Sequence, residues 1–198
     1  MPDTNRIDKT IIRKGNIKEQ GNDFLFWQSQ PFELRLSTVE EIRVEYNTFK
    51  YGFNKDFNEF IALLNANDVK YLIVGGYAVG FHGYPRYTKD LDIWILISHK
   101  NAENLLSTIE QFGFGSLGLL KDDFLKPDKF VQLGYPPNRI DILMSCDGVT
   151  FETCYQTKKQ IVINGLKMDF IDIENLKKNK KATARPQDLA DLDNLEAK

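Results

Sequence analysis

The chain has 198 residues, 42% of them hydrophobic and 27% charged, and a formal net charge of −2. This length suits one domain with a modest appendage, and the near-zero charge argues against a protein that coats nucleic acid. Two cysteines and two histidines exclude a disulfide-rich scaffold and a His-rich metal site. No apolar run approaches the ~20 residues that span a bilayer, and the N-terminus lacks the apolar core of a secretory signal. We therefore expect a cytoplasmic protein with reduced cysteines and no membrane partner.

The first 52 residues have a pattern of their own. Residues 1–22 are polar and predict an extended arm. Apolar residues then recur at three- and four-residue steps, which predicts an amphipathic helix. They are Phe32, Leu36, Val39, Ile42, Tyr46 and Phe49. A lone helix cannot bury this stripe, so we expect residues 31–50 to contact the chain's own domain or a second molecule. A break at residues 51–54 places a boundary near Gly52, between an arm and helix at 1–52 and a domain at 53–198.

Strand and helix patterns alternate through residues 53–198. The expected helices cover residues 101–112 and 174–181, with further ones after Asn54 and from Pro186. In the last, Leu189, Leu192 and Leu195 are spaced by three. Residues 69–74 and 91–97 predict strands, and residues 129–144 and 160–170 predict two hairpins. This order predicts an α+β (mixed α/β) domain, with a small mixed sheet flanked by helices.

Three carboxylates stand where a strand pattern expects apolar or neutral residues. Asp90 and Asp92 flank Leu91 at the start of the predicted central strand, so their side chains share one face. Asp141 lies inside another apolar run, and it meets the other two if the two strands pair. Like charges this close repel each other, and a divalent cation removes the conflict. Carboxylates at this spacing suit Mg²⁺, which we expect at Asp90, Asp92 and Asp141.

Gly75 and Gly76 directly follow the strand at residues 69–74, and paired glycines let a backbone approach a bulky anion. The chain order is strand, Gly-Gly, helix, Asp-x-Asp on the next strand and Asp on a later strand. It resembles the nucleotidyltransferase superfamily of the DNA polymerase β type, in particular bacterial minimal nucleotidyltransferase-like and antitoxin-like proteins. The likeness is carried by residues 71–79, 84–94, 139–143 and 181–192.

The resemblance implies transfer of a nucleoside monophosphate from a nucleoside triphosphate, with ATP expected, to a hydroxyl acceptor on a protein partner or an RNA end. Two Mg²⁺ ions and a role as the antitoxin of a toxin–antitoxin pair are also implied. Asp90, Asp92 and Asp141 would then be catalytic, with Asp141 helping to activate the acceptor. The residues expected at the nucleotide are Gly75, Gly76, Arg86, Lys89, Lys181 and Arg185.

Two other functions stay open: a small-molecule acceptor such as an antibiotic, and a catalytically idle binding module or antitoxin. The superfamily often has Ser where this chain has Gly76, which favours the idle module, whereas the intact carboxylates favour activity. Single residues also have structural interpretations. Asp141 could be the salt-bridge partner of Arg139, which shares its strand face, and Asp188 and Asp191 could belong to a solvated helix face.

Overall fold

The computed structural model describes residues 9–10, 12–16, 31, 55–84, 86–88, 90–115, 118–135 and 138–196. The predicted apolar stripe at residues 32–49, the boundary near Gly52 and Lys89 therefore lie outside the described residues and stay predictions.

The elements follow the alternation that the sequence predicts. They are, in chain order, β1 (Ile12–Asn16), α3 (Lys55–Ala66), β2 (Tyr71–Ile73), α4 (Gly75–Phe81), β3 (Asp90–Ile95), α5 (His99–Ile109), η3 (Glu110–Phe114), η5 (Lys121–Phe124), β4 (Lys129–Tyr135), β5 (Asn138–Leu143), α6 (Phe151–Thr157), β6 (Lys159–Ile163), β7 (Leu166–Phe170), α7 (Ile173–Thr183) and α8 (Pro186–Glu196). Only α6 among the α-helices after residue 90 has no counterpart in the prediction.

The seven described strands form one mixed sheet in the order β1-β4-β5-β3-β2-β7-β6. The pairs β3–β5 and β2–β7 are parallel, and the other neighbours are antiparallel. Both predicted hairpins are present as β4–β5 and β6–β7, and the predicted central strand is β3, in the middle of the sheet. The expected mixed α/β architecture is thereby confirmed. The extended segment β1, from the predicted arm, pairs with β4 and so joins the same sheet.

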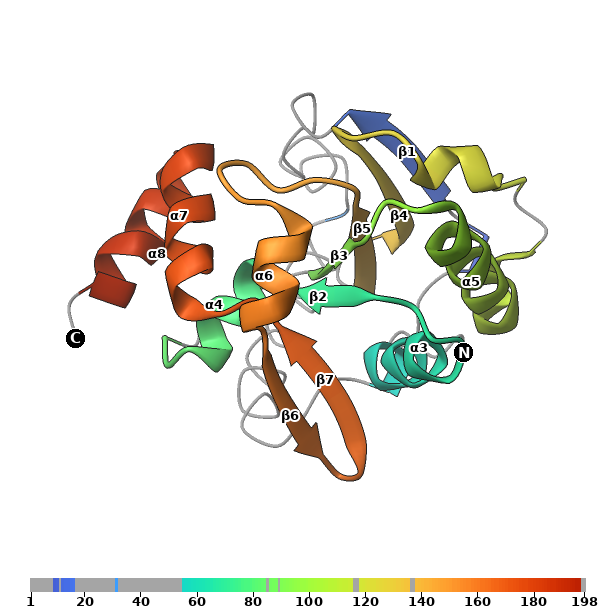
Figure 1. Ribbon diagram of the computed structural model, residues 1–198, viewed down its shortest axis with the longest axis horizontal. Coiled ribbons are helices and arrows are strands. Elements are labelled where there is room, and N and C mark those ends of the chain that lie inside the picture. Colours follow the sequence, from blue (N-terminus) through green and yellow to red (C-terminus); the bar gives the residue numbers. More distant parts are fainter. Residues whose placement is uncertain are drawn as a thin grey trace.

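Helices lie on both sides of the central strands (Figure 1). Helices α3 and α5 lie side by side to one side of β2 and β3, and α6, α7 and α8 lie to the other. The face of α3 predicted to be apolar is buried in the core. Trp94 follows Asp92 on the same face of β3, and its ring packs edge-on against Phe151 of α6, 5.2 Å between centroids. Helix α6 therefore covers the strand beside the carboxylates.

The C-terminal helix differs from its prediction. Leu189 is 45% exposed, while Asp188 and Asp191 are buried beside Leu195 on the inner face of α8. The helix expected from Pro186 is present, but the interpretation of Asp188 and Asp191 as part of a solvated helix face is wrong. The reason is that ion pairs, described below, make an acidic face the buried one. Among the described residues, no helix combines the length and the apolar character needed to cross a membrane.

Candidate active site

The parallel pairing of β3 with β5 brings the three carboxylates together. Asp92 stands opposite Asp141 in the ladder, and Asp90 stands opposite Arg139. Opposed residues of paired strands project from the same face of a sheet, and residues two apart on one strand do so as well. Asp90, Asp92 and Asp141 therefore share one face, which is the geometry that the sequence predicts for them.

A guanidinium group lies between two of these carboxylates. The Nη2 atom of Arg139 is 2.5 Å from Oδ2 of Asp90 and 3.0 Å from Oδ2 of Asp141, and its Nε donates to Oδ1 of Asp141 at 2.7 Å. Gln132, opposite Asp141 on β4, donates to Oδ2 of Asp141 at 3.2 Å. Thr88 donates to Oδ1 of Asp90 at 3.1 Å. The salt bridge between Arg139 and Asp141, which was the alternative interpretation of Asp141, is therefore present in the structure.

The two glycines make room for groups around the carboxylates. Gly75 begins α4 with a φ of +62°, and a Cβ atom there would lie 1.8 Å from Oδ2 of Asp92. A Cβ atom at Gly76 would lie 2.6 Å from Cβ and Oγ1 of Thr88. The backbone of Gly75 therefore lies against the Asp92 carboxylate. The serine that the superfamily often carries at the position of Gly76 would require Thr88 to move.

Burial and mutual repulsion raise the pKa of two of the three acids. Burial is the largest cause for Asp92, followed by the charges of Asp90 and Asp141, and its pKa is well above the usual value. Burial and the charge of Asp90 raise the pKa of Asp141 to about 6, although Arg139 and Gln132 act in the opposite direction. Both carboxylates are thus in surroundings where additional positive charge would stabilise the ionised form.

The three carboxylates have the oxygen ligands that a divalent cation such as Mg²⁺ prefers, but the guanidinium of Arg139 lies between Asp90 and Asp141. In the part of the chain that the structure describes, no group of three or more His, Cys, Asp or Glu side chains is placed to hold a metal ion. The carboxylate oxygens of Asp90, Asp92 and Asp141 are ligands that Mg²⁺ accepts, and the raised pKa values of Asp92 and Asp141 reflect a need for positive charge. A metal ion could bind these oxygens once the guanidinium of Arg139 has moved away from them.

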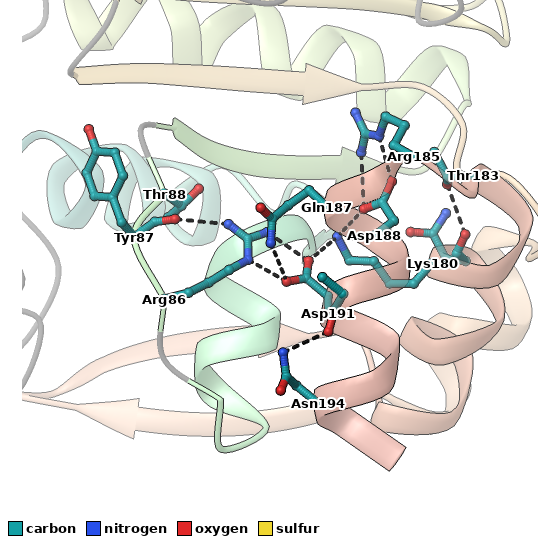
Figure 2. A network of polar contacts seen from close by, with 12 residues as sticks. Arg86, Tyr87, Thr88, Lys180, Thr183, Arg185, Gln187, Asp188, Asp191 and Asn194 are labelled. Atoms are coloured by element: carbon teal, nitrogen blue, oxygen red, sulfur yellow. Dashed lines mark hydrogen bonds and ion pairs between the residues drawn. The ribbon is translucent and has the colours of Figure 1, made fainter. Parts of the chain in front are cut away.

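A buried ion-pair network joins the C-terminal helices to the segment before β3 (Figure 2). Lys180 of α7 places its Nζ 2.5 Å from Oδ1 of Asp188 and 3.0 Å from Oδ2 of Asp191. Arg86 binds Asp191 through Nε at 2.6 Å and Nη2 at 2.8 Å. Arg185 binds Asp188 through Nε at 2.6 Å. Each buried carboxylate is therefore paired with two cations, which offsets the cost of removing it from water.

This network also faces the carboxylates on β3. The positive charge of Lys180 opposes the rise in the pKa of Asp92. Burial would lower the pKa of Arg185, but its bond to Asp188 and the charges of Asp188, Asp92 and Asp90 raise it. Lys180 and Arg185 thus supply positive potential beside the predicted metal-binding residues.

The predicted nucleotide-binding residues divide into three groups. Gly75, Gly76 and Arg185 lie around the carboxylates. Arg86 forms an ion pair with Asp191. Lys181 is exposed, whereas the preceding residue, Lys180, is buried. Lys89 lies outside the described residues.

Sequence reasoning missed Thr88, Gln132 and Lys180. One signal for Lys180 exists, because it follows the buried Leu176 by four residues and so shares the inner face of α7. Gln132 had no such signal, because its contact with Asp141 depends on the pairing of β4 with β5. Thr88 contacts Asp90 two residues further along the chain, so the two-residue spacing that relates Asp90 to Asp92 was a signal for it.

Comparisons with known proteins give distant likenesses in structure only. No protein-family profile matches the chain, and no curated protein matches its sequence. An antigenic nucleotidyltransferase-like protein from Paracoccidioides brasiliensis is 17% identical, with a TM-score of 0.43 over 70% of this chain and 72% of its own. A Thermotoga maritima protein with the provisional name nucleotidyltransferase is 15% identical, with a TM-score of 0.45 over 79% of this chain and 93% of its own. Because both likenesses are distant, the case for a function has to come from the residues of the site.

Proposed function

We propose that the chain is an Mg²⁺-dependent nucleotidyltransferase, which transfers a nucleoside monophosphate from a nucleoside triphosphate, with ATP expected, to a hydroxyl group. The hydroxyl oxygen bonds to the α-phosphorus, the bond between the α- and β-phosphates breaks, and pyrophosphate leaves. The observation that carries this proposal is the register of β3 on β5, in which Asp92 stands opposite Asp141 and Asp90 lies on the same face. Carboxylates that lie close together away from bulk water repel one another, and phosphoryl-transfer sites use such groups to bind metal ions.

In this proposal each group has a task that its position supports. Asp90, Asp92 and Asp141 would hold Mg²⁺, which supplies charge neutralisation of the triphosphate when bound. Asp141, whose pKa is raised to about 6, would accept a hydrogen bond from the acceptor hydroxyl and draw away its proton. Arg185 is held by Asp188 beside the acids and would bind phosphate oxygens.

The acceptor hydroxyl in this proposal belongs to a protein partner or an RNA end, in keeping with an antitoxin that modifies its toxin. To test this, α-labelled ATP is incubated with the full chain and a cell extract, and the labelled product is treated with protease or ribonuclease. Label that only protease releases would support a protein acceptor, and label that only ribonuclease releases would support RNA. Label in a small molecule alone would favour the antibiotic-type alternative.

The experiment that tests nucleotide binding is thermal unfolding of the full chain with Mg²⁺ and ATP. Ligand at about 100 times its Kd adds about 2.7 kcal/mol, which raises the Tm of a chain of this size by about 5–10 °C. Asp92→Asn should lose most of the rise, because it removes one of the negative charges that would hold the metal. Asp193→Asn, an exposed acid of α8, is the matched control and should keep it.

A catalytically idle binding module is the second candidate, and the position of Arg139 favours it. A guanidinium that neutralises Asp90 and Asp141 would stabilise the fold without any metal. This function predicts an unchanged Tm with millimolar ATP and Mg²⁺, so the same unfolding experiment separates the two candidates.

A further inference from the structure

Arg139 holds the position that a cation would need between two of the carboxylates. Its guanidinium contacts both oxygens of Asp141 and one oxygen of Asp90, all within 3.0 Å, and the residue is only 7% exposed. A guanidinium does not lose its proton in proteins. A metal ion can therefore reach these oxygens only if the arginine side chain moves.

The backbone limits how this exchange can happen. Arg139 lies opposite Asp90 in the β3–β5 ladder, and β5 also pairs with β4 on its other side. The side chain can swing, but its Cα atom is fixed by two neighbouring strands. In the free protein a guanidinium that leaves Asp90 and Asp141 loses two charged partners, which is costly.

We propose that Arg139 is an internal counter-cation that keeps the free protein from binding a divalent metal ion alone, so that metal binds together with the triphosphate. This inference rests on the proposed function and concerns how the same site is loaded. The triphosphate supplies negative oxygens for the displaced guanidinium, because arginine binds phosphate through two parallel hydrogen bonds. Metal and nucleotide then favour each other's binding, and the coupling is carried by one side chain.

The test measures Mn²⁺ binding to the full chain without nucleotide, from the electron paramagnetic resonance signal of the free ion. Arg139→Gln should bind Mn²⁺ about tenfold more tightly than wild type, since it removes the charged hydrogen bonds that compete for Asp90 and Asp141. The control is Lys158→Gln, which also removes one positive charge from an ion pair. Lys158 pairs with Asp169 at 2.5 Å, and this variant should bind Mn²⁺ as weakly as wild type. Equal or weaker binding by Arg139→Gln would overturn the inference, as would tight Mn²⁺ binding by wild type alone.

A second variant covers the case in which Arg139→Gln does not fold. Arg139→Met removes the charged hydrogen bonds but keeps an unbranched side chain that fills part of the space, so it should also bind Mn²⁺ more tightly than wild type. Binding equal to wild type would again overturn the inference.

Failure of the proposed function has a different signature. In that case Arg139→Gln gains Mn²⁺ binding, while ATP with Mg²⁺ does not raise the Tm of wild type. The opposite result, in which wild type binds the nucleotide and Arg139→Gln gains no Mn²⁺ binding, would overturn only the role of Arg139.

Discussion

Asp92 and Asp141 stand directly opposite each other on the parallel strands β3 and β5, on the sheet face that also carries Asp90. Arg139 neutralises Asp90 and Asp141, whereas Asp92 has no ion-pair partner within the described part of the chain. Gly75 lies beside Asp92, and because glycine has no side chain it leaves room for the carboxylate. In the free protein, burial and the charges of Asp90 and Asp141 therefore disfavour the ionised form of Asp92.

Asp92→Asn should stabilise the free protein while it abolishes binding of Mg²⁺ and ATP. The substitution removes a charge that burial, Asp90 and Asp141 all disfavour, and we expect a gain of about 1 kcal/mol in the free energy of unfolding. Urea denaturation at pH 7 without metal measures the gain, with Asp193→Asn as the exposed control. A loss of stability in Asp92→Asn would show that the carboxylate makes a favourable contact.

Gly75→Ala should both destabilise the fold and disturb the carboxylates. The new Cβ would lie 1.8 Å from Oδ2 of Asp92 and would also sit at a φ of +62°. Gly165→Ala is the matched control, since its φ is +80° but nothing lies within 4 Å of the added atom. Both variants should lose about 1 kcal/mol from backbone strain, and Gly75→Ala should lose about 1–3 kcal/mol more. Equal losses on denaturation would mean that Asp92 moves aside at no cost.

Ala184→Gly should make the protein more stable. Ala184 ends α7 in the left-handed conformation, with a φ of 52°, and its N–H donates to the carbonyl of Lys180. Glycine adopts this conformation without the clash that a Cβ atom causes, so we expect a gain of about 1 kcal/mol in urea denaturation. Asn164→Gly, in the β6–β7 turn at a φ of 51°, should gain less because asparagine tolerates this conformation. A loss on Ala184→Gly would contradict the expectation.

Asp191→Asn should cost about 3 kcal/mol at neutral pH, because it leaves Arg86 and Lys180 with one buried partner fewer. The variant should also lose less stability in acid than wild type. Burial alone would raise the pKa of Asp191, but the bonds and charges of Arg86 and Lys180 hold it below its usual value.

The direction of that acid effect follows from the lowered pKa. A carboxyl group with a lower pKa in the folded state stabilises the fold above its unfolded pKa of about 3.9, and the contribution disappears as the pH falls further. Denaturation curves at several pH values between about 7 and 1.5 measure it. The same pH slope in wild type and Asp191→Asn would contradict this account of the network.

Local patterns were sufficient for most of the secondary structure. Alternation and turn residues predicted both hairpins, and an unbroken apolar run predicted the central strand β3. The two-residue spacing placed Asp90 and Asp92 on one face, because successive side chains of a strand alternate. Helix α6 was not predicted, since only Phe151 and Cys154 of its seven residues are buried and they form no longer periodic pattern. The inner face of α8 was not predicted either, since a buried acidic face looks like a solvated one in sequence.

The sequence by itself determined most of the elements of this protein and the three carboxylates of its candidate site, because both follow from periodicities of a few residues. Only the tertiary structure decided that β5 pairs with β3 in the register that sets Asp141 opposite Asp92 and Arg139 opposite Asp90. It also decided that Lys180, rather than Lys181, faces the acids of α8. Strand order and helix orientation depend on contacts between residues far apart in the chain, and a single sequence holds no local signal for them.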